Sequence, residues 1–549
     1  MSAPLLSVRD LTVTVSGTEG ERTLLDGVSL DLRKGEVLGL VCESGSGKSL
    51  LCRSLVQLLP SRALTITGGS VTLAGRDLLA LGEGAMSQVR GAAIGMIFQN
   101  PSSHLDPVMS VGDQIAEGLM FHRRLDRAAA RAEAIAIMAQ VGFTDPARQF
   151  ANYPHEFSGG MRQRAMIAVA LACDPEILIA DEPTTALDVT TQKQILTLIR
   201  ELQRDHGTAV LFITHDMGVV AEIADRVAVM RQGRLVETGP LDTVLRNPTM
   251  EYTRNLLASV PSLVPRAPRE ESREPVVLEA NELTKVYKER AFFGKGREVV
   301  AADKVTLTLR KGRTLGIVGE SGSGKSTVAR CIVRLIDPTS GGVRLAGREI
   351  ADISRRLLQP HRQKIQIVFQ DPYRSLNPRV TVGDSIAEGP INYGVSQADA
   401  MKRARELLEL VGLPADAVSR YPHQFSGGQR QRIAIARALA LDPDVLVADE
   451  AVSALDVSVQ AQVLELLDEI QKRLGIAILF ITHDLRVAAQ ICDEVVVMQH
   501  GRVVEQGPAA EVLTHPKEAY TRALLEAAPG RGWDFANFRP VAEGLAVSA

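Results

Sequence analysis

The residues best suited to chemistry occur twice in this chain, in one order and at one spacing. Each half has a glycine-rich loop ending in Gly-Lys-Ser, an Asp-Glu pair after an apolar run, and a later histidine. The serine that opens a Ser-Gly-Gly motif recurs after 268 residues (426 − 158), and the histidine also recurs after 268 (483 − 215). Two complete sets at one spacing predict two sites that bind and cleave a nucleoside triphosphate.

The glycine-rich loops are suited to hold phosphates. Glycines let backbone N–H groups point inward at phosphate oxygens, the lysine adds a positive charge, and the serine hydroxyl helps to hold Mg²⁺. An apolar strand pattern precedes each loop and a helical pattern follows it, which is the context that such a loop requires. The residues predicted to bind ATP in the loops are Cys42, Glu43, Ser44, Gly45, Ser46, Gly47, Lys48, Ser49 and Leu50, and Gly319, Glu320, Ser321, Gly322, Ser323, Gly324, Lys325, Ser326 and Thr327.

The first loop lacks one expected glycine, because Cys42 stands where the second loop has Gly319. We favour the interpretation that Cys42 is a small residue whose backbone fits the turn. The alternative is a reactive thiol, since a cationic site at a helix N-terminus lowers the pKa of a cysteine. That alternative predicts that alkylation of Cys42 inhibits ATP hydrolysis and that ATP protects against it.

Polar residues that follow buried strands supply the remaining chemistry. An aspartate there suits water-mediated Mg²⁺ binding, and the next glutamate can orient or deprotonate the attacking water, although a helix N-cap is the simpler alternative. Each histidine lies 33 residues after its glutamate (215 − 182 and 483 − 450), which favours a γ-phosphate contact over a structural role. The predicted catalytic residues are Glu182, His215, Glu450 and His483. The predicted Mg²⁺ ligands are Ser49, Gln99, Asp181, Ser326, Gln370 and Asp449.

Bulk properties limit the classes of protein. The chain has 549 residues, 45% of them apolar, and a net charge of −3, so nothing favours nucleic-acid binding. No apolar run is long enough to span a membrane, and the N-terminus has no pattern typical of export. The five cysteines are scattered, which predicts neither disulfides nor a zinc site and favours a reducing cytoplasm.

The elements that must position these residues follow an α/β pattern. Short apolar runs, among them 37–41, 177–180, 314–318 and 445–448, alternate with helical patterns, which predicts a parallel sheet covered by helices in each half. We expect a first domain at 1–262, an exposed proline-rich linker at 263–276 and a second domain at 277–549. Matching tails at 247–257 and 515–525 predict a capping helix on each domain.

The motifs together resemble the nucleotide-binding domains of the ATP-binding cassette (ABC) family. Phe157-Ser158-Gly159-Gly160 and Phe425-Ser426-Gly427-Gly428-Gln429 are similar to the ABC signature, which is far more specific than a phosphate loop. The resemblance implies two tandem P-loop domains, each with a RecA-like parallel core, an antiparallel β subdomain and a helical signature subdomain. It also implies two composite ATP sites, in which each signature covers the ATP held by the other half. The signature residues implied to bind ATP are Ser158, Gly159, Gly160, Ser426, Gly427, Gly428 and Gln429.

The two halves are not equivalent within this resemblance. Tyr287 matches the aromatic residue that stacks on adenine in the family, whereas the first half has Val15 at that place. The first signature also continues with Met161 where the second has Gln429. Both halves keep their glutamate and histidine, so we expect both sites to hydrolyse ATP.

Further motifs resemble the oligopeptide/dipeptide/nickel importer ATPases, most closely the glutathione and peptide importers with two fused domains. The tails from Asn247-Pro248 and His515-Pro516, and Asp449-Glu450-Ala451, carry this resemblance. It implies two integral-membrane permease subunits, an extracytoplasmic binding protein, and a peripheral place on the cytoplasmic face of the bacterial inner membrane. Peptides are the expected cargo, with glutathione, nickel, opines and sugars as alternatives. No cysteine follows Cys492, so we expect no iron–sulfur cluster.

One different class also fuses two ABC domains in a single chain, namely ribosome-binding translation factors. Those proteins carry a long, charged, helical linker, whereas this linker is short, rich in proline and mixed in charge. DNA-repair members need coiled-coil or zinc insertions, and the sequence shows neither. The sequence therefore favours transport, with the fused halves acting as an intramolecular dimer.

Overall fold

The computed structural model describes residues 3–17, 20–43, 45–185, 187–269, 273–288, 298–453 and 455–541. Ser44, predicted to bind ATP, lies outside these residues, as do Ala186 and Ala454. The chain divides into two compact units. The first comprises Met1–Leu187, Thr191–Val260 and Phe535–Arg539, and the second comprises Asp188–Thr190, Pro261–Asp534 and Pro540–Ala549.

Within its described residues, the first unit has an antiparallel sheet of strand order β2-β1-β4-β5 and a larger sheet of order β10-β9-β3-β8-β7-β6. The larger sheet is parallel except for β10, which pairs antiparallel with β9. The strands are β1 (Leu6–Gly17), β2 (Gly20–Leu32), β3 (Val37–Val41), β4 (Leu64–Leu73), β5 (Arg76–Asp77), β6 (Ile94–Ile97), β7 (Ile177–Asp181), β8 (Ala209–Thr214), β9 (Arg226–Arg231) and β10 (Arg234–Pro240).

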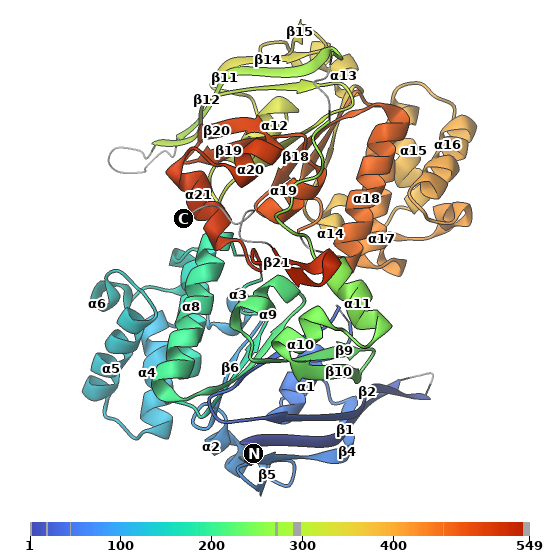
Figure 1. The fold of residues 1–549 in the computed structure, drawn as a ribbon. Helices are drawn as coiled ribbons and strands as arrows, with labels where there is room; N and C mark the ends of the chain where they lie inside the picture. Colours follow the sequence, from blue (N-terminus) through green and yellow to red (C-terminus); the bar gives the residue numbers. More distant parts are fainter. Residues whose placement is uncertain are drawn as a thin grey trace. The chain divides into compact units, whose positions relative to one another are not determined.

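The helices of the first half flank the larger sheet and form a region beside it (Figure 1). They are α1 (Lys48–Leu55), α2 (Glu83–Val89), α3 (Pro101–His104), α4 (Val111–His122), α5 (Arg127–Gln140), α6 (Pro146–Gln149), η1 (Pro154–Glu156), α7 (Gly159–Leu171), α8 (Val189–His206), α9 (Met217–Ile223), α10 (Leu241–Arg246) and α11 (Glu251–Ala258). Side-chain caps fix where helices of this region begin. Ser110 accepts the N–H of Asp113 at the start of α4, and Asp126 accepts the N–H of Ala129 at the start of α5.

The second unit repeats this plan with sheets of order β12-β11-β14-β15 and β16-β17-β18-β13-β19-β20. Its strands are β11 (Val276–Lys288), β12 (Glu298–Arg310), β13 (Thr314–Val318), β14 (Ser340–Leu345), β15 (Arg348–Glu349), β16 (Ile365–Val368), β17 (Val445–Asp449), β18 (Ala477–Thr482), β19 (Glu494–Gln499) and β20 (Arg502–Pro508). Its helices are α12 (Lys325–Ile332), α13 (Arg355–Arg362), α14 (Pro372–Ser375), α15 (Val382–Asn392), α16 (Gln397–Leu410), η2 (Ala415–Ser419), η3 (Pro422–Gln424), α17 (Gly427–Leu439), α18 (Val457–Leu474), α19 (Leu485–Ile491), α20 (Ala509–Thr514) and α21 (Ala519–Ala527). β21 (Trp533–Asp534), η4 (Phe535–Asn537) and β22 (Arg539–Pro540) end the described chain.

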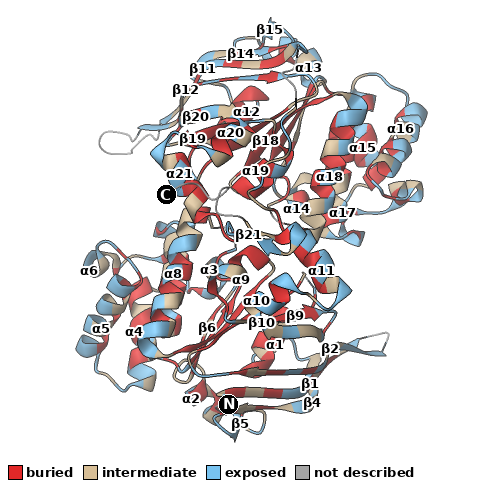
Figure 2. Cartoon of the chain, viewed as in Figure 1, coloured by how far each residue is buried: buried red, intermediate tan, exposed pale blue. Residues whose placement is uncertain are grey.

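The parallel strands form the centre of each unit. Every residue of β3, β7 and β8, and of β13, β17 and β18, is buried, because both faces of each parallel sheet are covered. Residues of the antiparallel sheet contribute to this cover, since Leu6 and Val8 of β1 share one core cluster with Leu38 of β3. Phe212 and Phe480, which occupy the same place in the repeat, are fully buried. Figure 2 shows the buried strands of the sheets in red and much of α16 in pale blue. The predicted α/β fold is confirmed in both halves.

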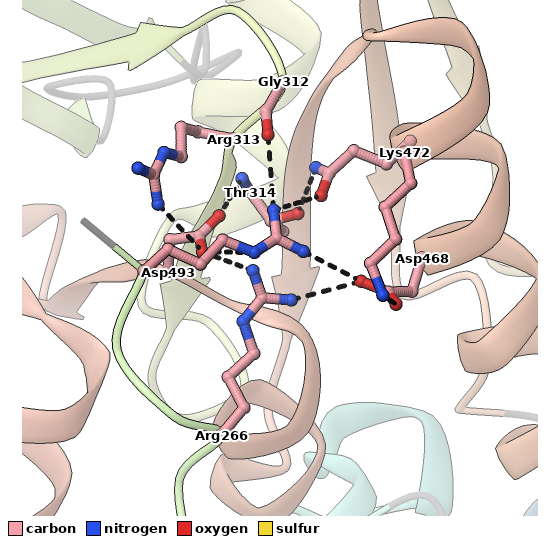
Figure 3. A network of polar contacts seen from close by, with 9 residues as sticks. Arg266, Gly312, Arg313, Thr314, Asp468, Lys472 and Asp493 are labelled. Atoms are coloured by element: carbon pink, nitrogen blue, oxygen red, sulfur yellow. Dashed lines mark hydrogen bonds and ion pairs between the residues drawn. The ribbon is translucent and has the colours of Figure 1, made fainter. Parts of the chain in front are cut away.

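The segment predicted to be an exposed linker is partly fixed to the second unit. Arg266 forms an ion pair with Asp493 (Figure 3), and Arg269 contacts Asp468 at 3.1 Å. The Asp493 side chain is only 7% exposed, and its Oδ2 also accepts the N–H of Thr314 at 2.8 Å. Because Thr314 begins β13, this part of the linker is joined to the strand that leads into the second glycine-rich loop.

No helix in the described ranges combines the length and the apolar character needed to cross a lipid bilayer.

Candidate nucleotide-binding and catalytic sites

Both glycine-rich loops connect a buried strand to the N-terminus of a helix. The first runs from β3 to α1 and the second from β13 to α12. Gly47 and Gly324 stand at the N-caps with φ of 97° and 101°, a left-handed backbone that favours glycine. A Cβ would also lie 2.7 Å from Leu25 at the first position and 2.2 Å from a backbone oxygen of Ala301 at the second. The glycines are therefore needed for both conformation and space.

The two loops differ where they leave their strands. Gly319 has a φ of 148°, and a Cβ there would lie 2.3 Å from the backbone oxygen of Met498. Cys42 takes this place in the first loop. Its φ is not positive, and the whole residue is buried. This burial supports the interpretation of Cys42 as a packed small residue, and the thiol offers no exposed surface to an alkylating reagent in this conformation.

In the first half, the predicted catalytic side chains converge on Glu182. Its carboxylate forms an ion pair with Lys48, lies 3.4 Å from Nδ1 of His215, and accepts a hydrogen bond from Nε2 of Gln99 at 2.7 Å. Thr185, which the sequence analysis did not select, donates its hydroxyl to the same carboxylate at 2.9 Å. The Glu182 side chain is only 3% exposed, so these partners offset the cost of burying its charge.

The second half brings together the matching residues but pairs its lysine differently. Gln370 donates to Glu450 at 2.8 Å, and His483 lies 3.5 Å from the same carboxylate. Lys325 instead donates to the backbone oxygens of Gly319 at 2.8 Å and Glu320 at 2.7 Å. The Glu450 side chain is also more exposed, at 17%.

These arrangements shift the ionisation of the buried groups. Burial tends to raise the pKa of the Glu182 carboxyl, but hydrogen bonds and charges from His215 and Lys48 lower it overall. The same Glu182 carboxylate raises the pKa of His215, against the opposing effect of burial. In the second half, burial tends to raise the pKa of the Glu450 carboxyl, but the hydrogen bond and charge of His483 lower it overall. Burial lowers the pKa of Lys325.

Both glutamates also have an unusual backbone. Glu182 and Glu450 each have a φ of 50°, which non-glycine residues adopt at a cost of order 1–3 kcal/mol. Their N–H groups donate to the backbone oxygens of Ile213 at 2.9 Å and Ile481 at 3.0 Å in the neighbouring strands. These hydrogen bonds hold each glutamate at the carboxyl end of the sheet, beside its histidine.

The predicted metal ligands lie next to the glutamates. The Ser49 hydroxyl is hydrogen-bonded to Asp181, and the Ser326 hydroxyl donates to Oδ1 of Asp449 at 2.9 Å. Burial raises the pKa of both aspartates. Oδ1 of Asp181 is buried and has no hydrogen-bond partner among the described residues. A buried carboxylate oxygen without a partner is a position that a cation or its bound water would satisfy.

The signature serines begin helices α7 and α17, where helix N–H groups are exposed to a ligand. Ser158 accepts the N–H of Met161 at 3.3 Å, and Ser426 accepts the N–H of Gln429 at 3.3 Å. Gln429 also accepts the N–H of Ser426 at 3.0 Å and completes a capping box. The Met161 side chain has no oxygen that could accept the N–H of Ser158 in the same way. The first predicted signature therefore cannot form the second hydrogen bond of this capping box.

The predicted adenine-stacking residue is available at the surface. Tyr287 is 41% exposed in β11, where it pairs with Val299 of β12. Val15 occupies the matching register of β1 and pairs with Arg22 of β2. Only the second half therefore presents an aromatic ring at this position.

Sequence reasoning also missed a tyrosine in each tail helix. The Tyr520 hydroxyl of α21 accepts the N–H of Glu320 in the second glycine-rich loop at 3.2 Å. Tyr252 of α11 occupies the same place in the first half. The repeated Tyr-Thr-Arg in both tails was the available signal.

Comparisons with known proteins match the motifs and the tails. Residues 25–185 and 302–453 match the ABC transporter family, and residues 236–293 and 504–534 match the oligopeptide/dipeptide transporter C-terminal region. The peptidoglycan transport ATP-binding protein YejF of Agrobacterium fabrum is 47% identical over 96% of both chains. The glutathione import ATP-binding protein GsiA of Salmonella choleraesuis is 46% identical over 96% of this chain and 90% of its own. A solved dimeric ATP-binding cassette, MJ0796 bound to ADP and Pi, is 31% identical over 42% of this chain and 98% of its own, with a TM-score of 0.38.

Proposed function

The chain belongs to the ABC transporter ATPases that carry the oligopeptide/dipeptide transporter C-terminal region, and from this premise we propose that it powers the uptake of short peptides through a separate membrane permease. The observation that carries this proposal is the presence of that C-terminal region in both halves, each following a complete set of ATPase residues. The two relatives named for peptidoglycan and glutathione support a cargo that contains peptide bonds.

ATP would lie with its phosphates on the glycine-rich loops. The N–H groups at the starts of α1 and α12 would bind phosphate oxygens, and Lys48 and Lys325 would contact the outer phosphates. Mg²⁺ would neutralise phosphate charge and align the outer phosphates. The side chains that would hold it are Ser49, Gln99 and Asp181 in the first half and Ser326, Gln370 and Asp449 in the second, and the buried Oδ1 of Asp181 without a partner fits this role.

Hydrolysis would use Glu182 and Glu450 to orient the attacking water and accept its proton. In the first half, Lys48 must first leave Glu182, because the ion pair occupies the carboxylate. The triply charged end of ATP would draw Lys48 away, so that nucleotide binding itself would free Glu182. His215 and His483 would then contact the γ-phosphate beside the glutamates.

Each ATP would be completed by the signature of the other half. Ser426, Gly427, Gly428 and Gln429 would cover ATP on Lys48, and Ser158, Gly159 and Gly160 would cover ATP on Lys325. The N-termini of α17 and α7 would direct N–H groups and a partial positive charge at the γ-phosphate. ATP binding would thus close the halves as an intramolecular dimer, and hydrolysis would reopen them.

The closure would act on two permease subunits at the cytoplasmic face of the inner membrane, with an extracytoplasmic binding protein delivering cargo. The segments after Gln99 and Gln370 would transmit the motion. Glutathione, nickel or an opine would be the alternative cargo. A twin-ABC translation factor is the alternative of a different class, and it predicts binding to ribosomes instead of to a permease.

The test uses the full chain copurified from the membranes of its native host with its permease and placed in proteoliposomes with the binding protein. ATP-dependent uptake is measured for labelled dipeptides and tripeptides, glutathione and Ni²⁺. The matched control is the double variant Glu182→Gln plus Glu450→Gln, which keeps the size of both side chains and removes both bases.

We expect uptake of short peptides that requires ATP and is lost in the double variant. Uptake of glutathione or Ni²⁺ alone would replace the proposed cargo. Sedimentation of the chain with ribosomes, without a copurifying permease, would overturn transport in favour of the translation alternative.

A further inference from the structure

The last helix of the second half, α21, reaches the second glycine-rich loop. The hydroxyl of Tyr520 accepts the backbone N–H of Glu320 at 3.2 Å. The ring packs against the buried core, and burial is the main cause that raises the pKa of this hydroxyl to about 12. Tyr520 is therefore neutral at physiological pH and contacts the loop from the side of the tail.

The same peptide group is also held by the loop lysine. The backbone oxygen of Gly319 and the N–H of Glu320 belong to one planar peptide unit. Nζ of Lys325 donates to that oxygen at 2.8 Å, while Tyr520 accepts from that N–H. The peptide is thus contacted at both ends, and its oxygen is one of two backbone acceptors that hold the lysine amine, the other being the oxygen of Glu320 at 2.7 Å.

The tail helix is itself anchored to the sheet. The carboxylate of Glu505 in β20 accepts the N–H groups of Lys517 at 2.8 Å and Glu518 at 3.2 Å, just before α21 begins. β20 pairs with β19, which pairs in parallel with β13, the strand that leads into the loop. The tyrosine therefore reaches the loop from a rigid support, and this limits how far the hydroxyl can move.

We propose that Tyr520 is a positioning residue of the second ATP site, which fixes the Gly319–Glu320 peptide and so preorganises the loop and Lys325 for the phosphates. The inference rests on the proposed contact between Lys325 and ATP. Helix α21, which lies in the C-terminal region that distinguishes this branch of the family, thereby contributes to the affinity of the second site for ATP.

The first half provides an internal comparison. Tyr252 of α11 lies close enough to Glu43 for the backbone N–H to affect the pKa of its hydroxyl. Its hydroxyl nevertheless makes no hydrogen bond of normal geometry among the described residues. Cys42 also replaces the glycine whose oxygen receives the lysine in the second loop. We therefore expect the tail tyrosine to matter less for the first loop.

The experiment measures hydrogen–deuterium exchange by mass spectrometry on the full chain with its permease. Peptides that cover the two glycine-rich loops are followed as a non-hydrolysable ATP analogue is titrated, so that each loop reports its own affinity. The variants are Tyr520→Phe and Tyr252→Phe. Tyr393→Phe is the matched control, because its hydroxyl donates to the backbone of Gln359 at 2.7 Å in the helical region. Lys325→Ala tests the underlying ATP site.

Loss of one hydrogen bond changes an equilibrium by roughly 2- to 12-fold. We expect Tyr520→Phe to speed hydrogen exchange in the second loop. The nucleotide concentration that gives half of the maximal protection of this loop should rise by about the same factor. The first loop should change by less than about twofold in this variant, and Tyr252→Phe and Tyr393→Phe should have smaller effects than Tyr520→Phe.

The outcomes separate this inference from the proposed function. If Tyr520→Phe leaves the second loop unchanged, or weakens both loops equally through a general loss of stability, the positioning role is overturned. If Lys325→Ala does not weaken nucleotide protection of the second loop, the proposed ATP site itself fails. If Lys325→Ala weakens nucleotide protection of the second loop but Tyr520→Phe has no effect, the role of Tyr520 is refuted and the proposed ATP site stands.

Discussion

The two proposed catalytic centres contain the same side chains but hold their lysines differently. Lys48 forms an ion pair with Glu182, whereas Lys325 donates to two backbone oxygens of its own loop. Gly319, which opens the second loop, has a φ of 148° and its backbone oxygen accepts Nζ of Lys325 at 2.8 Å, whereas the first loop opens with the buried Cys42. Motifs with the same sequence pattern therefore leave the proposed general base paired with the lysine in one site and not in the other.

The comparison implies that ATP has more to rearrange in the first site. Glu182 is nearly inaccessible and shares its carboxylate among Lys48, His215 and Gln99. Glu450 is more exposed, and its carboxylate accepts a hydrogen bond from Gln370 and lies 3.5 Å from His483. Moving Lys48 to the phosphates exchanges one ion pair for another, while moving Lys325 gives up neutral backbone acceptors. The contact between the lysine and ATP should therefore contribute more binding free energy at the second site than at the first.

The largest effect is expected from removing each base separately. Glu182→Gln and Glu450→Gln should each lower the ATPase rate of the permease-bound chain by about 100-fold or more, since general-base catalysis contributes typically 10²–10⁴-fold. Glu182→Gln should also tighten ATP binding at its own site, because the carboxylate no longer competes for Lys48. Steady-state ATPase rates and the nucleotide retained per chain measure these two effects.

Glu133→Gln serves as the control, because Glu133 forms an exposed ion pair with Arg123 in the helical region. A loss of activity in only one of the two catalytic variants would show that the other site is mainly regulatory. Near-full activity when both bases are removed would refute the catalytic assignment.

A second comparison concerns how the strands before the loops are held. Oδ2 of Asp225 accepts the N–H of Val37, and Oδ2 of Asp493 accepts the N–H of Thr314, both at 2.8 Å. The Asp225 side chain is 45% exposed and meets a single arginine at 3.4 Å. The Asp493 side chain is 7% exposed and faces the guanidinium groups of Arg266 and Arg313 (Figure 3). The guanidinium group of Arg269 lies 3.6 Å from the same carboxylate.

Replacing these aspartates should therefore have unequal costs. Asp493→Asn keeps an oxygen that can accept the N–H of Thr314 but leaves three partly buried guanidinium groups without their carboxylate. The cost of breaking a fully buried pair, about 3–5 kcal/mol, is the upper bound of the expected effect. Asp225→Asn breaks an exposed pair worth about 0–1 kcal/mol. Hydrogen exchange of β3 and β13 in urea would give both free energies of opening. Equal costs would contradict the view that the linker arginines stabilise the second unit.

Much of the catalytic geometry could be predicted from the sequence because it depends on the order of parallel strands. Gln99, Asp181 and Thr214 follow or end β6, β7 and β8, which are neighbours in one sheet, so their carboxyl ends meet. The loop glycines were equally predictable, because the backbone at Gly47 and Gly324 needs a left-handed φ. These features depend on local sequence pattern and on the rule that the carboxyl ends of neighbouring parallel strands meet at one edge of the sheet.

The remaining features depend on contacts between distant residues. Arg266 meets Asp493 across 227 positions of sequence, and Tyr520 meets Glu320 across 200. Composition suggested that the linker was exposed and that the tail helix was only a cap, since neither pattern encodes a partner. The different lysine partners were also out of reach, because a side chain chooses among acceptors that only the folded loop brings near it.

A third comparison concerns the anchors of the two tail helices. The carboxylate of Glu237 accepts the N–H of Thr249 at 2.8 Å, its hydroxyl at 2.7 Å and the N–H of Met250 at 3.3 Å. Burial alone would raise the pKa of Glu237, but the nearby Thr253 hydroxyl and these hydrogen bonds lower it. A carboxyl whose pKa is lower in the folded chain stabilises folding above the unfolded pKa of about 4.3, and this contribution is lost as pH falls through the folded value.

Glu237→Gln should accordingly destabilise the docking of α11 by about 1–2 kcal/mol near pH 7, and the difference from the native chain should shrink below about pH 4.3. Glu505→Gln is the matched variant for α21, where the carboxylate accepts two backbone N–H groups instead of these several bonds. Hydrogen exchange of α11 and α21, converted to free energies of opening at each pH, gives the comparison. A Glu237→Gln effect that grows as pH falls would contradict the charged carboxylate as the anchor, because protonation would then be strengthening the bonds that the substitution removes.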